Sequence, residues 1–331
     1  MNTTDTHRQT RTWKNYFGLT ARGFAMGSAD VVPGVSGGTM AFILGIYEEL
    51  ITSIRDIASP QTVRLLAGFK LKQAYDELPW RFLLAVGLGI VLAILSLAQF
   101  LEYMLQNQPV MIWSFFFGLV LASIFTVSKR VKQWQISRLV GLVIGAVVAY
   151  IIVGMVPLET PNDPWFLFFS GALAICAMIL PGISGAFILV LLGKYEFVLS
   201  AVNNRDMITL AIVAAGAAVG LVTFAQILGW FFKRYHDITV AVLMGLMLGS
   251  LRKIWPWKET VAYIERHGVQ IPIKQVNVLP PGWSSEVALA IVLAIIGFGV
   301  VIVLDYVASR KQDEPEEPGV PAAAEKEFAD S

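Results

Sequence analysis

The feature that most constrains this chain is a helix-breaking phrase that occurs twice inside long apolar stretches. VVPGVSGGT runs from Val31 to Thr39, and ILPGISGAF runs from Ile179 to Phe187. Pro-Gly followed by Ser-Gly is typical of turns, yet apolar residues flank both copies. Non-helical backbone at membrane depth is tolerated only where protein buries it or where it lines a wet cavity. A chain that breaks two membrane segments in the same way is therefore expected to bury the breaks in protein or to line a cavity with them.

The composition supports the premise that these stretches lie in a membrane. The chain has 331 residues, of which 56% are hydrophobic and 15% are charged, whereas soluble domains carry about 25% charged residues. A full span needs roughly 20 apolar residues, and six uninterrupted runs fit, near 81–104, 110–128, 138–157, 206–232, 237–254 and 285–307. The interrupted stretches 17–53 and 164–201 have arms too short for two spans each and predict re-entrant helical hairpins. We expect an all-α polytopic membrane protein of about six full spans plus two hairpins.

The positions of Lys and Arg indicate the orientation of the chain. A polar N-terminus (1–16) and a disordered acidic tail (308–331) are both expected in the cytoplasm, together with the basic turns that follow the first hairpin and the spans. The opposite face receives QNQP and PLETPNDP, which hold no Lys or Arg. Loop 252–284 is the exception, because it carries Arg252, Lys253, Lys258, Arg266 and Lys274 on the outer face.

The two phrases belong to a longer internal repeat. A shift of 148 residues aligns Pro33-Gly34 with Pro181-Gly182 and Tyr47-Glu48 with Tyr195-Glu196 without a gap. We interpret 17–157 and 164–307 as two repeats. Three spans separate the hairpins, so the second must enter from the opposite face. Inverted-topology repeats are typical of secondary transporters, whose site lies near the midplane where broken helices meet.

The chemistry at such a site favours an anion. Free backbone N–H groups at a helix start and the positive end of the helix dipole attract negative charge, and charges inside apolar segments are functional candidates. Arg22 can neutralise a phosphate, and Asp30 can pair with Arg22 or take up a proton. The candidate phosphate-binding residues are Arg22, Ser28, Asp30, Gly34, Ser36, Gly37, Gly38, Thr39, Gly182, Ser184 and Gly185, and the candidates for proton coupling are Asp30, Glu48 and Glu196.

Plainer structural interpretations stand beside these. Ser36 and Ser184 can serve close helix packing alone, and Arg22 can be a snorkelling anchor. The Tyr-Glu pairs are typical of the membrane interface, and Lys194 and Glu196 are expected to lie in water. Glycines spaced four apart predict packing faces, at Gly141/Gly145, Gly216/Gly220 and Gly245/Gly249.

At these residues the chain resembles the bacterial polyprenyl-phosphate transporters called PopT. GSADVVPGVSGGTMAFILGIYEEL (27–50) and its echo ILPGISGAFILVLLGKYEFVL (179–199) carry the resemblance, which covers roughly 17–307. It implies a flippase that returns undecaprenyl phosphate across the bacterial cytoplasmic (inner) membrane for reuse in cell-wall synthesis, with a polyprenyl phosphate lipid and membrane lipids as partners. Gly38-Thr39 of the first copy becomes Ala186-Phe187 in the second, so the second tip is expected to be the weaker phosphate ligand.

Two other classes of function remain open. A transporter or channel for a small soluble anion would use the same helix tips. An intramembrane lipid phosphatase would need an activated nucleophile or a metal cluster, and Ser36 and Ser184 have no obvious base, so we expect no enzyme. No cofactor, metal or nucleic acid is expected, and the sequence leaves open whether the chain forms a homo-oligomer.

Overall fold

The structure is a computed structural model, and it describes most of the chain. The described residues are 12–30, 36–57, 59–68, 78–129, 131, 133–158, 160–266, 269–280 and 282–313, together with Lys70, Lys72, Gln73 and Tyr75. Gly34, one of the predicted site residues, lies outside them, as do the polar N-terminus before Thr12 and the tail after Asp313.

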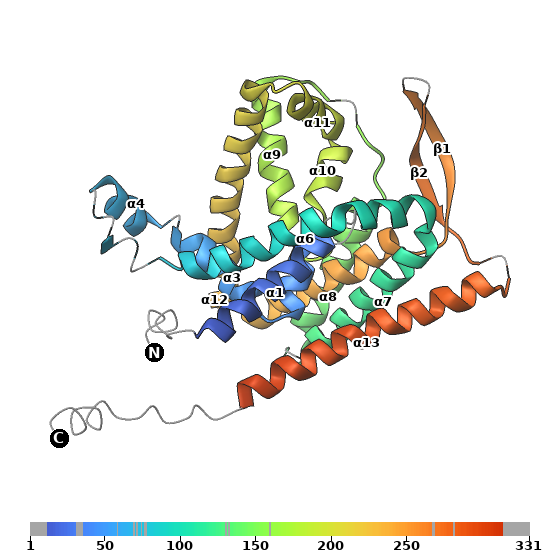
Figure 1. The fold of residues 1–331 in the computed structure, drawn as a ribbon, viewed down its shortest axis with the longest axis horizontal. Helices are drawn as coiled ribbons and strands as arrows, with labels where there is room; N and C mark the ends of the chain where they lie inside the picture. Colours follow the sequence, from blue (N-terminus) through green and yellow to red (C-terminus); the bar gives the residue numbers. More distant parts are fainter. Residues whose placement is uncertain are drawn as a thin grey trace.

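Helices make up nearly all of the described fold (Figure 1). The first half consists of α1 (Trp13–Asp30), α2 (Gly37–Ile43), α3 (Tyr47–Ile57), α4 (Pro60–Ala67), α6 (Trp80–Asn107), α7 (Pro109–Ser128) and α8 (Ile136–Ile152). The second half consists of α9 (Pro164–Ile179), α10 (Gly185–Leu191), α11 (Tyr195–Asn203), α12 (Met207–Ile254), the strands β1 (Lys258–Arg266) and β2 (Val269–Asn277), and α13 (Ser285–Asp313).

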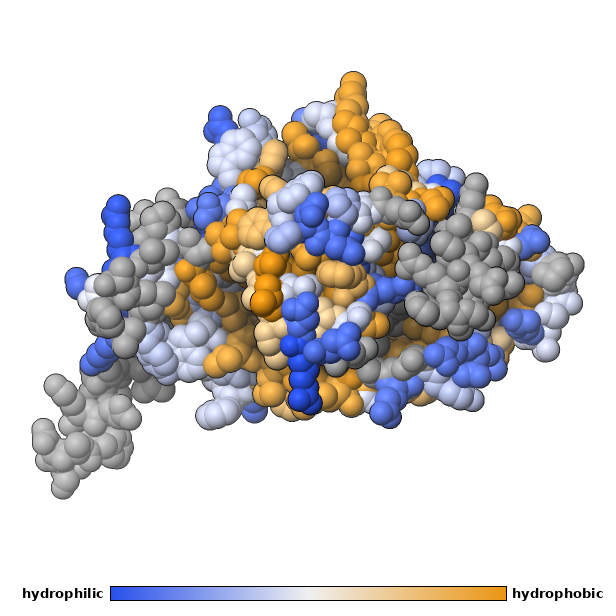
Figure 2. All heavy atoms as spheres, turned by 90° about the horizontal axis from the view of Figure 1, so that it is seen from above, coloured by the Kyte–Doolittle hydropathy of each residue, from blue (hydrophilic) through white to orange (hydrophobic). Residues whose placement is uncertain are grey.

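Long apolar helices confirm the coarse prediction of a polytopic membrane protein. Within the described residues, four helices are long and apolar enough to cross a membrane, at Trp80–Leu97, Pro109–Ser128, Met207–Ile254 and Ser285–Tyr306, or five if the bent pair α10–α11 counts as one span. Large apolar side chains are exposed along α6, α8 and α13. Figure 2 shows broad apolar areas between hydrophilic patches. Such a surface suits hydrocarbon better than water.

Two details differ from the sequence expectations. The helix expected over 138–157 ends at Ile152. Non-helical backbone at Tyr235 (φ −137°, ψ 48°) divides α12 into two helices, at the position where the sequence separates the runs 206–232 and 237–254. The all-α prediction is wrong for loop 252–284, because β1 and β2 pair there as an antiparallel ribbon, from Lys258 opposite Asn277 to Arg266 opposite Val269. The segment 258–266 contains Thr260, Val261, Tyr263 and Ile264, which are residue types enriched in strands.

Glycines set the closest helix contacts, as their spacing predicts. In four helix pairs, a glycine on each helix faces a backbone carbonyl of the other, so that a Cβ at either position would collide with backbone. The four glycine pairs are Gly23 with Gly89 (α1–α6), Gly171 with Gly216 (α9–α12), Gly118 with Gly297 (α7–α13) and Gly145 with Gly245 (α8–α12). Small residues let helix backbones approach without side chains between them, which is a main source of association in membranes.

The two halves place their broken helices at the same spacing. α2 begins at Gly37 and α10 at Gly185, and α3 begins at Tyr47 and α11 at Tyr195, so both starts differ by 148 residues (185 − 37 and 195 − 47). In the second half, residues 180–184 between α9 and α10 are non-helical.

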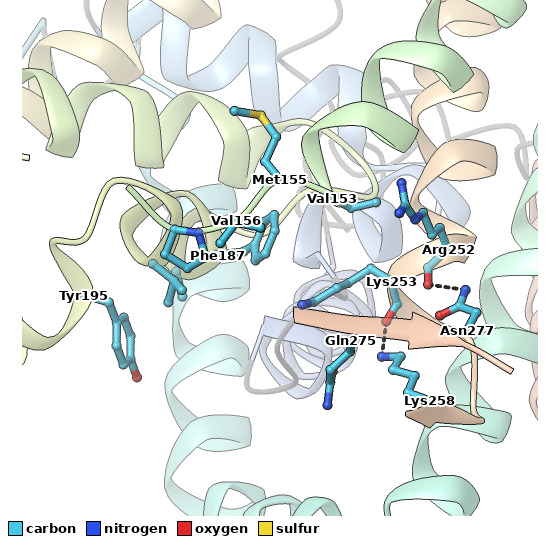
Figure 3. Close-up of a pocket in the computed structure, with 14 residues that line it drawn as sticks. Val153, Met155, Val156, Phe187, Tyr195, Arg252, Lys253, Lys258, Gln275 and Asn277 are labelled. Atoms are coloured by element: carbon cyan, nitrogen blue, oxygen red, sulfur yellow. Dashed lines mark hydrogen bonds between the residues drawn. The ribbon is translucent and has the colours of Figure 1, made fainter. Parts of the chain in front are cut away.

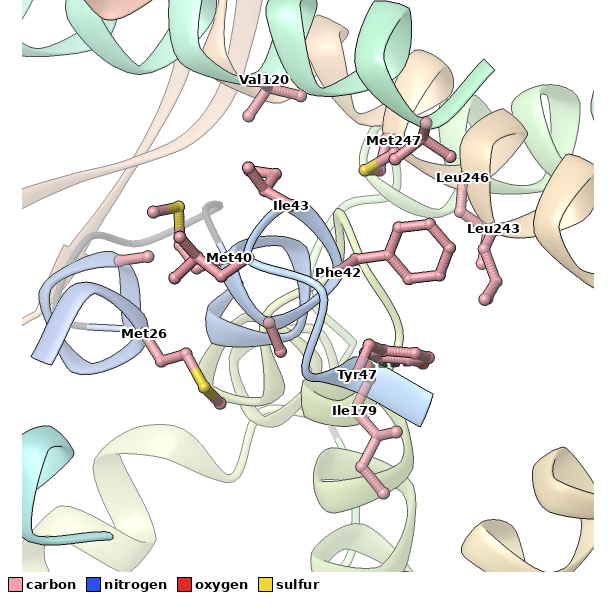
Figure 4. Close-up of a cluster of buried hydrophobic side chains, with 14 of the residues drawn as sticks. Met26, Met40, Phe42, Ile43, Tyr47, Val120, Ile179, Leu243, Leu246 and Met247 are labelled. Atoms are coloured by element: carbon pink, nitrogen blue, oxygen red, sulfur yellow. Dashed lines mark hydrogen bonds between the residues drawn. The ribbon is translucent and has the colours of Figure 1, made fainter. Parts of the chain in front are cut away.

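The first broken helix lies at the centre of the core. Every residue of α2 is buried, and Met40, Phe42 and Ile43 contact α7 and α12 side chains such as Val120 and Met247 (Figure 4). A seven-residue helix is too short to be stable alone. Its environment therefore fixes it, and the residues around its start are held in one arrangement.

Candidate functional site

We call residues 36–47 the first tip. Side chains of neighbouring residues cap the N–H groups at the start of its helix, α2. Ser36 is the N-cap of α2 in an extended conformation, and its Oγ accepts a hydrogen bond from the Gly38 N–H at 3.1 Å. The Asp30 carboxylate, at the end of α1, accepts from the Gly37 N–H at 2.6 Å. The first N–H groups of a helix lack partners within the helix, and here side-chain oxygens satisfy two of them. Asp30 thus occupies the position where the sequence predicts a bound anion.

The first tip also caps the end of α9 in the second half of the chain. The Ser36 hydroxyl lies 3.1 Å from the Met178 carbonyl oxygen and 3.2 Å from that of Leu180, to which it donates. The Tyr47 hydroxyl donates to the carbonyl between them, that of Ile179, at 3.1 Å, and Figure 4 shows the two residues side by side. The last carbonyls of a helix have no partner within it, so these two hydroxyls satisfy backbone that the break at Pro181-Gly182 leaves unpaired.

A further hydrogen bond joins the two breaks directly. The Gly182 N–H donates to Thr39 Oγ1 at 2.9 Å, and Thr39 is fully buried. Gly182 has φ +91°, and a Cβ there would lie 2.8 Å from Ser250 Oγ and 3.0 Å from the Leu246 carbonyl oxygen. The left-handed backbone and the close approach to α12 both require glycine. The structure therefore brings Ser36, Thr39 and Gly182 together at the end of α9.

The second tip, residues 182–195, does not repeat these contacts. Ser184 is the N-cap of α10, but its side chain makes no capping hydrogen bond, and among the described residues its hydroxyl has no partner. Ala186 and Phe187 replace Gly38 and Thr39, and both line an open cavity. The second helix start is therefore less satisfied and more accessible than the first.

The other predicted residues lie on α1, α3, α10 and α11. Arg22 is half-buried on α1, eight residues before Asp30. The Ser28 hydroxyl donates to the Phe24 carbonyl in the preceding turn at 2.8 Å. The carboxylate of Glu48 is more than half exposed and lies 3.0 Å from His236 Nε2, and Glu196 is exposed. Gly185 is close-packed, because a Cβ there would lie 2.6 Å from the Ala174 carbonyl oxygen.

Two interpretations of single residues are wrong. Lys194, expected in water, is buried, and its ammonium donates to the Thr160 carbonyl oxygen at 2.7 Å and to Asn162 Oδ1 at 2.5 Å. Tyr47, expected at the membrane interface, is 2% exposed and belongs to the core, whereas Tyr195 is 42% exposed. Sequence position alone could not separate these two tyrosines, because both follow the same Gly-x motif.

A cavity beside the second tip was not predicted from the sequence. It has a volume of about 310 Å³ and lies between α10, the segment after α8, the end of α12 and the β1–β2 ribbon (Figure 3). Phe187, Val190, Met155 and Val156 form an apolar wall. The other wall is polar, and its side chains are Arg252, Lys253, Lys258, Gln275 and Asn277.

Each of the three cations in this cavity lies over an aromatic ring. The Arg252 guanidinium carbon is 4.3 Å from the Tyr150 ring centroid, the Lys253 ammonium is 4.6 Å from that of Phe187, and the Lys258 ammonium is 4.4 Å from that of Trp113. Lys258 also donates to the Lys253 carbonyl. Among the described residues, no carboxylate pairs with any of the three.

Burial, and then the neighbouring Lys253, lower the pKa of Lys258 to about 7. A desolvated ammonium beside another cation loses its proton more readily. In the sequence these three residues are an exception to the orientation rule. Their common role is indicated by their spacing, because Arg252, Lys253 and Lys258 flank the aromatic segment Trp255-Pro256-Trp257.

Comparison with known proteins adds to this geometry. Residues 26–271 match the family model described as VCA0040-like, undecaprenyl phosphate translocase-like. A polyprenyl-phosphate transporter of Vibrio cholerae is 42% identical over 303 residues, which cover 89% of this chain and 98% of that protein. A polyprenyl-phosphate transporter of Staphylococcus aureus is 30% identical over 254 residues, covering 71% of this chain and 84% of that protein. No solved structure matches the chain significantly. These matches and the long apolar helices identify a multi-pass membrane protein.

Proposed function

Because this chain belongs to the undecaprenyl phosphate translocase-like family, we propose that it is a flippase that moves a polyprenyl monophosphate across the cytoplasmic membrane. The observation that carries the proposal is the Vibrio cholerae polyprenyl-phosphate transporter, 98% of whose length aligns with this chain at 42% identity. The carrier is undecaprenyl phosphate, which is released on the outer face during cell-wall synthesis and must return to the inner leaflet. A bare phosphate cannot cross hydrocarbon, because desolvation of a charge costs several kcal/mol or more.

The proposed architecture is a pair of inverted-topology repeats, each with a re-entrant hairpin. Three facts support it: the common spacing of α2/α3 and α10/α11, the bend of 110° between α10 and α11, and the matching glycine contacts of α1–α6 with α9–α12 and of α7–α13 with α8–α12. The pairs α7–α13 and α8–α12 each consist of one helix from the first half and one from the second. Both termini then lie in the cytoplasm.

The proposed mechanism is alternating access around a phosphate site where the tips meet. The Gly182 N–H already donates to Thr39 there, and Ser36 donates to the end of α9. A phosphate oxygen can replace the Met178 and Leu180 carbonyls as acceptor from Ser36. Arg22 supplies charge, and Ser28, Asp30, Gly34, Gly37, Gly38, Ser184 and Gly185 complete the proposed site.

Proton coupling is a separate part of the proposal. Asp30 holds the start of α2 through the Gly37 N–H, so its protonation would weaken that contact and free the first tip. Glu48 and Glu196, at equivalent positions after the two hairpins, are the other candidates.

Reconstitution in vesicles tests the function. Purified protein in proteoliposomes with undecaprenyl phosphate should speed the appearance of headgroup on the opposite leaflet, whereas protein-free vesicles and undecaprenol should show no such effect. Uptake of inorganic phosphate without lipid crossing would establish a transporter for a small soluble anion. Release of inorganic phosphate from the lipid would establish an enzyme.

A further inference from the structure

The cavity beside the second tip holds positive charge without a matching negative charge. Arg252, Lys253 and Lys258 line it together, and no described carboxylate pairs with them. Each cation is held over an aromatic ring, which keeps it in place at a modest gain in energy but does not neutralise it. Like charges that line one cavity repel each other. An anion that enters the cavity relieves this repulsion.

We propose that this cavity is a docking site for the headgroup of an isoprenoid phosphate monoester, distinct from the contact between the tips. The proposal deepens the proposed function and rests on it, because it names where the lipid is received on the face that carries the β1–β2 ribbon. In Figure 1 this ribbon lies near the start of α13, away from the end of α13 and the start of α1.

The chemistry of the polar wall fits a phosphate monoester. Such a group carries about −1.5 to −2 charges at neutral pH and three strong acceptor oxygens. Lysine ammoniums and an arginine guanidinium are its preferred partners, and the Gln275 side chain adds a neutral polar group on the same wall. The Asn277 amide donates to the Arg252 carbonyl at 2.9 Å, so β2 fixes the end of α12 that carries two of the cations. The volume of about 310 Å³ lies at the small end of the roughly 300–1,000 Å³ of typical ligand pockets.

An apolar groove beside the same segment fits the isoprenoid chain. This groove of about 310 Å³ lies between α7, α13 and Trp255-Pro256-Trp257, and its lining includes Phe117, Leu121, Ile291 and Phe298. The segment 252–258 therefore has two sides, with its cations in the basic cavity and its tryptophans in the apolar groove. Trp113, over which Lys258 lies, precedes the groove residue Ser114. A charged head with a long apolar tail matches this division, whereas a soluble anion would use the cavity alone.

The position of the cavity also connects it to the second tip. Ala186 and Phe187 form part of its wall and lie in the first turn of α10, next to the start that Ser184 caps. A headgroup in this cavity thus lies beside the less satisfied helix start. Docking on this face followed by transfer to the tips is the order that we infer.

Binding of a short soluble analogue tests the docking site. We would measure the affinity of the detergent-solubilised full chain for farnesyl phosphate, with farnesol and inorganic phosphate as separate probes. The double variant Lys253→Gln/Lys258→Gln should weaken farnesyl phosphate binding at least about tenfold, because each charge-assisted hydrogen bond is worth about a tenfold change or more. Lys258→Arg, which keeps the charge, should retain most of the affinity.

A matched control separates docking from general loss of charge. Lys129 also lies over an aromatic ring, 4.8 Å from the centroid of Phe125, but does not line the cavity. Lys129→Gln should leave affinity unchanged. Unchanged affinity in the double variant, or an equal loss in Lys129→Gln, would overturn the proposal. Inorganic phosphate that binds as tightly as farnesyl phosphate would overturn the assignment to a lipid.

The apolar groove has its own test. Leu121→Gln should reduce the gain in affinity from geranyl phosphate to farnesyl phosphate, because a polar side chain in the groove disfavours contact with the longer chain. Leu139→Gln, on the exposed side of α8, is the control and should keep that gain. An undiminished gain in affinity in Leu121→Gln would show that the isoprenoid chain binds elsewhere.

Transport by the same variants separates failure of the docking site from failure of the proposed function. If wild-type protein moves undecaprenyl phosphate while Lys253→Gln/Lys258→Gln binds farnesyl phosphate normally, the docking site is wrong and the proposed function stands. If wild-type protein moves no lipid, the proposed function fails whatever the binding data show.

Discussion

The two tips share a sequence phrase but differ in what surrounds them. In the first tip, residues 36–47, Ser36, Thr39 and Tyr47 are buried and hydrogen bonded to the second half of the chain. In the second tip, residues 182–195, the Ser184 hydroxyl makes no capping bond and Tyr195 is exposed. The first tip therefore acts as the anchor that completes the end of α9. The second tip is left beside a basic cavity, where a ligand can reach it.

The position before each tyrosine shows the same division. Ile46 is buried in the apolar core, whereas Lys194, its counterpart 148 residues later (194 − 46), is tied to Thr160 and Asn162 of the α8–α9 connection. At this position the first tip is thus stabilised by apolar packing, and the second tip by polar contacts to a loop. A duplicated sequence fixes similar backbones, while unequal neighbours give each copy a separate role.

The largest expected effect is loss of the anchor. Ser36→Ala/Thr39→Val removes the hydroxyls that pair with the end of α9 and with the Gly182 N–H, and should lower the free energy of unfolding by about 2–4 kcal/mol in total, since each such buried bond contributes roughly 0.6–1.7 kcal/mol and unpaired groups add to the loss. Ser184→Ala should change it by less than about 0.5 kcal/mol. Unfolding of the two proteins in mixed micelles with increasing SDS gives both values. Equal losses would show that the tips are equivalent.

An added methyl group probes the same difference through packing. A Cβ at Gly38 would collide with the Ile179 carbonyl oxygen, so Gly38→Ala should cost about 1–3 kcal/mol through overpacking. The second tip already has alanine at the equivalent position, and Ala186→Gly should cost at most about 1 kcal/mol. The unfolding midpoint in SDS compares them. A stable Gly38→Ala protein would mean that the tips separate easily.

The tyrosines give a smaller contrast. Tyr47→Phe deletes the donor to the Ile179 carbonyl and should cost about 0.6–1.7 kcal/mol. Tyr195→Phe, on an exposed ring, should fall within about 0.5 kcal/mol of wild type. The same SDS titration measures both, and a larger effect at Tyr195 would reverse the assignment of anchor and accessible tip.

The smallest effect is a pH dependence confined to the second tip's cavity. Lys258 has a pKa of about 7, so it is charged below this pH and neutral above it. Arg252 and Lys253 from α12, Tyr195 from α11, and the uncharged Gln275 and Asn277 from β2 share the cavity. Affinity for farnesyl phosphate should fall by up to about tenfold as pH rises from 6.5 to 8.5, because the ligand then binds one cation fewer.

The control for this dependence is Lys258→Arg, whose guanidinium stays charged throughout the range. Isothermal titration calorimetry at several pH values should show its affinity nearly constant above pH 7. A wild-type affinity that does not fall above pH 7 would remove Lys258 from the headgroup contacts. Below about pH 6 the phosphate itself gains a proton, so both proteins should bind more weakly there.

Periodic and local signals predicted much of the fold. Runs of about 20 apolar residues located the long helices, since hydrocarbon forces the backbone to satisfy its own hydrogen bonds. Pro181-Gly182 marked the break between α9 and α10, and glycines four apart located the close helix contacts at Gly145 and Gly245. The β1–β2 ribbon was missed because a loop was assumed between spans, although Val261, Tyr263 and Ile264 favour a strand.

The sequence by itself determined that the chain crosses a membrane, that it breaks two helices with one phrase, and that Ser36, Thr39 and Gly182 lie at those breaks, because hydropathy and backbone restrictions act locally. Only the tertiary structure decided that Ser36 and Tyr47 cap a helix more than 130 residues away along the chain, that Lys194 is buried, and that Arg252, Lys253 and Lys258 share a cavity with α10. Burial and pairing depend on which distant segments meet. Two copies of the same phrase therefore acquire different partners once the helices pack.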